Sequence, residues 1–163
     1  MSNATLCVDM DGTVGFAMRA VGPDSRKTIE LFDEVLDELR NTLSIGRRVK
    51  EDIGSLNEVY QKCSVENWDG YGAHSITPEA YWEARSFIED LPSWLPRPEI
   101  SANPDGEIVF EWYENRSRLF AISVYGENEL IFAGLYGPNS IRGATYFGGS
   151  IPEIVMDYIQ KVN

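Results

Sequence analysis

The chain has 163 residues, 43% of them hydrophobic, which is enough for one domain with a buried core. It carries 26 acidic residues against 14 Lys and Arg, so its formal net charge is -12 at pH 7. Because affinity for a polyanion comes largely from protein cations, this charge argues against direct binding to nucleic acid or to an anionic membrane. It favours a protein partner with a basic surface.

Cysteine and histidine are scarce, which limits the chemistry available to the chain. Cys7 and Cys63 lie far apart, and His74 is the single histidine, so a zinc site of the usual ligand type is not expected. No phosphate-binding or dinucleotide glycine fingerprint occurs, and we expect no cofactor. The start of the chain does not look like a secretion signal and no stretch is long enough to span a membrane, so the sequence predicts a cytoplasmic protein with free thiols.

Residues 1–22 are predicted to form a β-hairpin. Asp11-Gly12 stands between two runs that contain apolar residues, and this dipeptide favours a two-residue turn because both turn positions need positive φ. With that turn, Val8 would pair with Gly15 and Cys7 with Phe16.

The same segment supports a second interpretation. Asp9-Met10-Asp11-Gly12-Thr13 resembles the first motif of the haloacid dehalogenase-like phosphotransferases. The resemblance implies that Asp9 is the nucleophile, that Asp11 exchanges a proton with the leaving group, and that Mg²⁺ neutralises the phosphate. The later motifs of that family are missing, so a Mg²⁺-dependent phosphatase-like hydrolase is the alternative rather than the leading hypothesis.

Residues 24–63 are predicted to form a helical arm. Apolar residues recur at three- and four-residue spacing with acids between them, which indicates an amphipathic helix over about 26–44. This apolar set is Ile29, Phe32, Val35, Leu36, Leu39 and Leu43. Gly46 is expected to end or kink that helix, and a second helical register continues to about residue 63. The apolar stripes face either the protein's own sheet or a partner helix, and the sequence leaves both open.

Residues 64–163 are predicted to form an α+β core. Thr77 caps a helix over 78–91 whose first position is Pro78, and an extended proline-rich connector follows over 92–98. Strands are expected over 107–113, 119–125, 130–136 and 141–147, and turns of three to four residues make them antiparallel neighbours. The inward faces of the two covering helices are expected to be Tyr81, Ala84, Phe87, Ile88 and Leu91, and then Ile151, Ile154, Val155, Tyr158, Ile159 and Val162.

These elements predict one α+β domain. An antiparallel meander of four to five strands would have one face covered by the helices near 78–91 and 151–162. In the strand over 107–113, Ile108, Phe110 and Trp112 share the inner face, while Glu107 and Glu111 belong to the wet side.

The stretch Asn67 to Ala73, NWDGYGA, is the least ordinary part of the sequence. It packs two aromatics, one acid and two glycines between two helices, and Asp69 can accept hydrogen bonds from nearby backbone N–H groups. One interpretation is a structural corner in which Trp68 and Tyr71 plug the core. The other is a recognition loop, which would include His74.

From about residue 58 to the end, the chain resembles a widespread family of small bacterial proteins that share the NWDGYGA motif. The matching elements are Asn67 to Ala73, Thr77-Pro78, Leu91-Pro92, Pro104 to Ile108 and Glu111-Trp112. The resemblance implies an antiparallel meander with a terminal amphipathic helix. It implies no catalytic residue.

The leading functional hypothesis is a non-enzymatic, acidic bacterial or phage protein that binds a protein partner, in the manner of an antitoxin, an immunity protein or an inhibitor. Aromatic anchors ringed by acids favour such a surface. The candidate binding residues are Trp68, Asp69, Tyr71, His74, Trp94, Glu111, Trp112 and Arg142. A sensor with a ligand pocket at Tyr71, Trp94 or Trp112 is a further alternative, and a homo-oligomer is compatible with all three.

Overall fold

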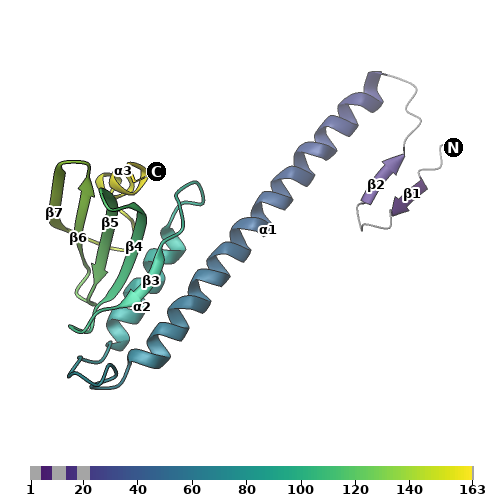
Figure 1. Ribbon diagram of the computed structural model, residues 1–163. Coiled ribbons are helices and arrows are strands. Elements are labelled where there is room, and N and C mark those ends of the chain that lie inside the picture. Colours follow the sequence, from purple (N-terminus) through teal and green to yellow (C-terminus); the bar gives the residue numbers. More distant parts are fainter. Residues whose placement is uncertain (1–4, 9–13, 18–22, 163) are drawn as a thin grey trace. The chain divides into compact units, whose positions relative to one another are not determined.

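The computed structural model describes residues 5–8, 14–17 and 23–162 (Figure 1). The elements in chain order are β1 (Thr5–Val8), β2 (Val14–Ala17), α1 (Pro23–Cys63), α2 (Pro78–Asp90), β3 (Glu99–Ala102), β4 (Ile108–Asn115), β5 (Arg118–Val124), β6 (Glu129–Tyr136), β7 (Asn139–Tyr146) and α3 (Glu153–Gln160). The chain divides into two compact units, 1–44 and 45–163. The boundary therefore lies within α1, whereas the sequence suggested subdivisions before and after this helix.

β1 and β2 pair as an antiparallel two-stranded sheet, so the predicted hairpin is confirmed, but its predicted register is wrong. Val8 pairs with Val14 and Cys7 with Gly15. Each of these β1 residues thus pairs one position earlier on β2 than predicted. The predicted turn, Asp11-Gly12, lies outside the described residues.

α1 is one continuous helix, so the prediction that the helix ends at Gly46 is wrong. The helix begins at Pro23, earlier than expected, because the fixed φ of proline suits the first helical turn. Gly46 and Gly54 both lie inside it. Glycine costs a helix only about 1 kcal/mol relative to alanine, which is too little to end it between good helix formers.

The second half of α1 packs on the core of the 45–163 unit. For these residues the apolar stripe therefore faces the protein's own core and not a partner helix. Leu56 is fully buried, and Val49, Ile53 and Tyr60 pack against the same core. The first half belongs to the other unit and is described below.

The unit 45–163 contains a five-stranded antiparallel meander in the order β3-β4-β5-β6-β7 (Figure 1). The predicted α+β class with a meander of four to five strands is confirmed. β4 alternates as expected, because Ile108, Phe110 and Trp112 are buried while Glu111 is exposed. The inner face packs against α2 and α3, and the rings of Phe87 and Phe110 lie 4.8 Å apart.

The buried faces of both covering helices differ in part from the predicted ones. In α2 the buried set includes Ala80 and Glu83, while Tyr81 is only half-buried. In α3 the predicted inward residue Ile154 is exposed, whereas Val155 and Ile159 are buried. At 3.6 residues per turn a short helix buries only a narrow stripe, and residues at its edge reach water.

Glu83 is a buried carboxylic acid next to the β5–β6 turn. Desolvation raises its pKa, and the backbone N–H groups of Asn128, Gly126 and Glu129 counteract this only in part. Neither carboxylate oxygen makes a hydrogen bond of proper geometry. The ionised form of Glu83 therefore weakens the fold at neutral pH.

We predict that Glu83→Gln stabilises the protein at pH 7 by about 1 kcal/mol, since it removes a charge that the fold desolvates. A pKa raised in the folded state favours folding below the ordinary glutamate value of 4.5, and that contribution is lost as pH rises through the folded pKa. The difference between the variant and the native chain should therefore shrink towards pH 4. Urea unfolding at several pH values measures it, with exposed Glu58→Gln as the control; an equal gap at all pH values would contradict the prediction.

Candidate functional site

The NWDGYGA loop closes on itself through its own backbone. Asn67, Gly70 and Gly72 have φ values of 59°, 78° and 99°, which reverse the chain within a few residues. The Asn67 N–H donates to the Ala73 carbonyl at 2.7 Å, and the Gly70 N–H donates to the Asn67 carbonyl at 3.0 Å. Glycines at these positions are explained by the tight turn without a ligand.

The polar side chains of the loop are used to hold it together. Oδ1 of Asp69 accepts from the N–H groups of Tyr71, at 2.8 Å, and Ala73, at 3.1 Å. Oδ1 of Asn67 accepts from the Gly72 N–H at 2.7 Å. The hydrogen bond from Tyr71 lowers the pKa of Asp69 and keeps its carboxylate ionised. Asp69, a predicted binding residue, thus holds the loop closed through Oδ1.

His74 follows the loop and faces Glu66. Its Nδ1 lies 3.8 Å from Oε2 of Glu66, and both side chains are mostly exposed. The other oxygen of Glu66 accepts from the Ser75 hydroxyl at 2.9 Å, and this bond lowers the pKa of Glu66. The His74 N–H donates to the Pro104 carbonyl at 2.8 Å, which ties the segment after the loop to the β3–β4 connection.

The two aromatics of the loop have different environments. Trp68 is half-buried against the core, and its indole N–H donates to the His74 carbonyl at 3.0 Å. Tyr71 is 95% exposed. The interpretation that both side chains plug the core is therefore wrong for Tyr71, because the loop closes beneath it and leaves the ring outside.

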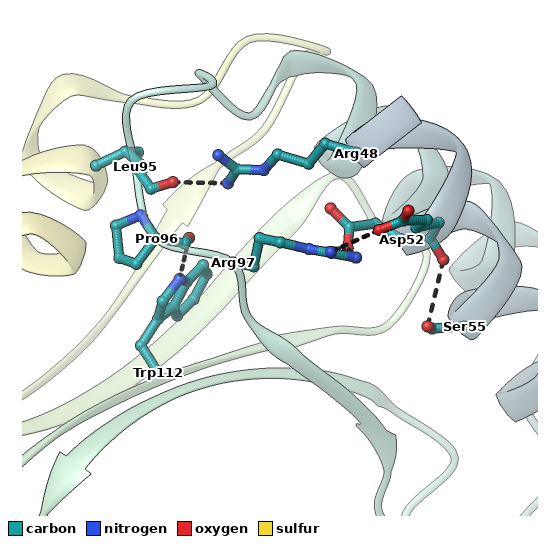
Figure 2. Close-up of polar contacts among 8 residues, drawn as sticks. Arg48, Asp52, Ser55, Leu95, Pro96, Arg97 and Trp112 are labelled. Atoms are coloured by element: carbon teal, nitrogen blue, oxygen red, sulfur yellow. Dashed lines mark hydrogen bonds and ion pairs between the residues drawn. The ribbon is translucent and has the colours of Figure 1, made fainter. Parts of the chain in front are cut away.

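The other predicted aromatics do not join this corner. The loop precedes α2, whereas Trp94 lies in the connector that follows it, so the 13 residues of this helix stand between them in the chain. Trp94 is exposed. Trp112 is buried in the core, where its indole N–H donates to the Pro96 carbonyl at 2.8 Å (Figure 2). The expected single aromatic corner is divided among three places.

Glu111 and Arg142, the remaining predicted residues, lie in one row across the exposed face of the sheet. The cross-strand partners run from Glu111 to Ala121, then Ala133, then Arg142. Both charged side chains are exposed. The structure thus places them on a common surface, with β5 and β6 between them.

The first half of α1 carries an apolar surface that was not among the predicted site residues. Val35, Leu39 and Leu43 are 50%, 54% and 71% exposed, and we call these three residues the helix stripe. The three- and four-residue spacing of apolar residues was the available signal, but spacing alone does not tell whether a stripe is covered.

The aspartates of the phosphatase-like motif, Asp9 and Asp11, lie outside the described residues. The strand before them, β1, pairs antiparallel with β2. The phosphatase interpretation requires the end of a parallel strand, so this neighbourhood gives it no support.

Comparisons of the chain with known protein families, with curated proteins and with solved structures gave no match. The resemblance to NWDGYGA-containing bacterial proteins therefore stays a prediction. In the part of the chain that the structure describes, no three His, Cys, Asp or Glu side chains come together to hold a metal ion. Nor does any helix among the described residues have the length and apolar character to cross a membrane.

Proposed function

We propose that this protein is a non-enzymatic binding module that engages a protein partner through the helix stripe of α1. The exposure of Val35, Leu39 and Leu43 carries the proposal. Burying a large aliphatic side chain contributes about 1.5–3 kcal/mol. Covering the three exposed side chains of the helix stripe would therefore contribute substantially to the free energy of binding. A helix with such a stripe binds by laying it into an apolar groove or against another helix.

The charges beside the stripe indicate the kind of partner. Glu34, Asp37 and Glu38 are exposed on the same turns of α1, and the whole chain carries a net charge of -12. A partner with basic residues around an apolar groove would be steered to this helix and bound there. An antitoxin, an immunity protein or an inhibitor of a nucleic-acid enzyme works on partners of this kind, and we assign the chain to that functional class.

The proposal predicts that Leu39→Asp/Leu43→Asp abolishes capture of the partner. The tagged full chain and the double variant would be used in pull-downs from lysate of the organism that encodes the protein, with stoichiometry measured by mass spectrometry. Two added carboxylates in the stripe lose the apolar contacts and place charges in the interface.

Thr42→Asp/Ser44→Asp is the matched control, because it adds the same charges to the same turns at exposed positions beside the stripe. We expect a stoichiometric partner with the native chain and with this control but not with the stripe variant. A partner retained equally by all three chains, or no stoichiometric partner at all, would refute the proposal.

A further inference from the structure

The face of the sheet opposite α2 and α3, here called the outer face, is unusually apolar for a surface exposed to water. An antiparallel sheet with one solvated face normally alternates apolar inside and polar outside. Here Tyr113 of β4, Ile131 of β6 and Tyr146 of β7 are all exposed, and Leu119 and Leu135 are only half-buried.

The central row of the outer face carries two acids on one side, Glu99 on β3 and its cross-strand partner Glu111 on β4, and a base, Arg142, on β7. Glu111 on β4 and Arg142 on β7 are separated by Ala121 and Ala133, which are cross-strand neighbours on β5 and β6. At about 4.8 Å between strands, the two charges stand roughly 14 Å apart, beyond reach of each other. The two alanines leave a flat surface between the acid and the base. A second copy of this row in the reverse order would place its base over the acid and its acid over the base.

A two-fold axis that runs parallel to the strands, above the outer face and midway between β5 and β6, relates two copies in this way. It lays β4 over β7 of a second copy and β5 over its β6, as in aligned packing of two sheets about 10 Å apart. Glu111 then faces Arg142 of the second copy, and Arg142 faces Glu111. Both charge pairs form in one dimer because a two-fold interface repeats each contact.

The rows on either side match in size under the same operation. In one row Val109 pairs across the sheet with Ser123, which pairs with Ile131 and then Ala144. The axis sets Val109 over Ala144 and Ile131 over Ser123, a large side chain over a small one each time. Such alternation lets two surfaces interdigitate.

The other flanking row follows this rule at Tyr113 and Ser140 and makes an apolar contact at its centre. Tyr113, Leu119, Leu135 and Ser140 are successive cross-strand neighbours. The axis sets Tyr113 over Ser140 and one leucine over the other. The same operation thus pairs opposite charges in the central row and large side chains with small ones at the edges of the third row and throughout the second.

The available area fits a reversible dimer. The axis overlaps four strands, β4 to β7, and at about 4.8 Å between strands and about 3.3 Å per residue they give a face of roughly 500 Å² per copy. The total of about 1,000 Å² is in the range of weak, reversible interfaces. We propose that the outer face is a homodimerisation surface whose occupant is a second copy of this chain, separate from the partner surface on α1.

The test uses reciprocal charge reversals in the full chain. In Glu111→Arg the two facing positions, 111 and 142, are both basic, and in Arg142→Glu both are acidic, so each variant repels itself at two places in the dimer. Sedimentation velocity over a concentration series is expected to show dimerisation weakened about tenfold or more for each variant alone. Mixing the two variants restores opposite charges at both contacts, so the mixture should form a heterodimer as tightly as the native chain.

Controls separate this interface from other associations and from misfolding. Arg116→Glu reverses a charge in the β4–β5 turn and should leave dimerisation unchanged. The series is repeated with Leu39→Asp in every chain to suppress association through α1. The double variant Glu111→Arg/Arg142→Glu keeps both charge pairs and is expected to dimerise normally, even if one single variant folds poorly. Three results would overturn the proposal. The native chain could stay monomeric into the hundreds of micromolar, the charge reversals could leave its dimerisation unchanged, or the mixture of the two variants could stay monomeric.

Discussion

Gly126→Ala is expected to destabilise the 45–163 unit by about 3 kcal/mol. Gly126 lies in the β5–β6 turn with φ of +96°, a conformation that costs alanine about 1 kcal/mol. Its added Cβ would also lie 2.7 Å from the Ala80 nitrogen and 2.9 Å from the carbonyl carbon of Glu79. These are backbone atoms of the first turn of α2, which cannot rotate away, and such overpacking adds about 1–3 kcal/mol.

Gly137→Ala provides the matched control for the clash. Gly137 lies in the β6–β7 turn with φ of +65°, and open space surrounds the position of its Cβ. It therefore shows the cost of positive φ alone, about 1 kcal/mol. Equilibrium urea unfolding of both variants measures the difference. Equal losses would mean that the β5–β6 turn does not approach α2 as closely as described.

This close approach shows which part of the fold could be predicted from the sequence. Gly126-Glu127-Asn128 indicated a turn, and Thr77-Pro78 indicated the start of a helix, because both signals come from neighbouring residues. That the turn presses on the helix depends on how the strands stack over α2. No local pattern contains that information.

The incorrect predictions have the same origin. Continuation of α1 through Gly46 depends on the balance of small propensities along a long helix. The hairpin register depends on the whole connection rather than on one dipeptide. The sequence also indicated the inner face of β4 correctly, since Phe110 and Trp112 alternate with polar residues, but it could not tell which aromatic residues share a surface.

The candidate site was the least predictable part. Trp68, Tyr71, Trp94 and Trp112 were grouped by residue type, and the fold separates them because two precede α2, one follows it and one is inside the core. Glu111 and Arg142 share a row only through three strand pairings. Such a row can be found only once the register of every strand is known.

Two arginines join the second half of α1 to the connector between α2 and β3 (Figure 2). One belongs to α1 and donates to the connector, and the other belongs to the connector and donates to α1. Arg48 of α1 donates to the carbonyl oxygens of Ser93 at 2.5 Å and Leu95 at 2.6 Å. Arg97 of the connector donates to Asp52 of α1 through Nε, at 2.8 Å, and through Nη2. The side chain of Asp52 is only 6% exposed, so its carboxylate depends on this partner.

Arg97→Met is expected to destabilise the protein by about 2 kcal/mol at pH 7. The change keeps an unbranched stem but leaves Asp52 with a buried charge and no guanidinium. Loss of one partner of a fully buried pair costs about 3–5 kcal/mol, and we expect less because Arg97 is itself 44% exposed. Hydrogen exchange should show the first loss of protection in α1 between residues 45 and 63, since this contact holds that segment to the connector.

The double variant Asp52→Leu/Arg97→Met separates the cost of an unpaired charge from the loss of a favourable contact. Removing both partners leaves no charge to desolvate, so stability should return to within about 1 kcal/mol of the native chain. Arg118→Met is the control, because it removes an ion pair with Glu114 in which both side chains are about half exposed, and should cost under about 0.5 kcal/mol. If the double variant is no more stable than Arg97→Met alone, the prediction is wrong. The cost of losing Arg97 would then come from the lost contact between α1 and the connector and not from the unpaired charge of Asp52.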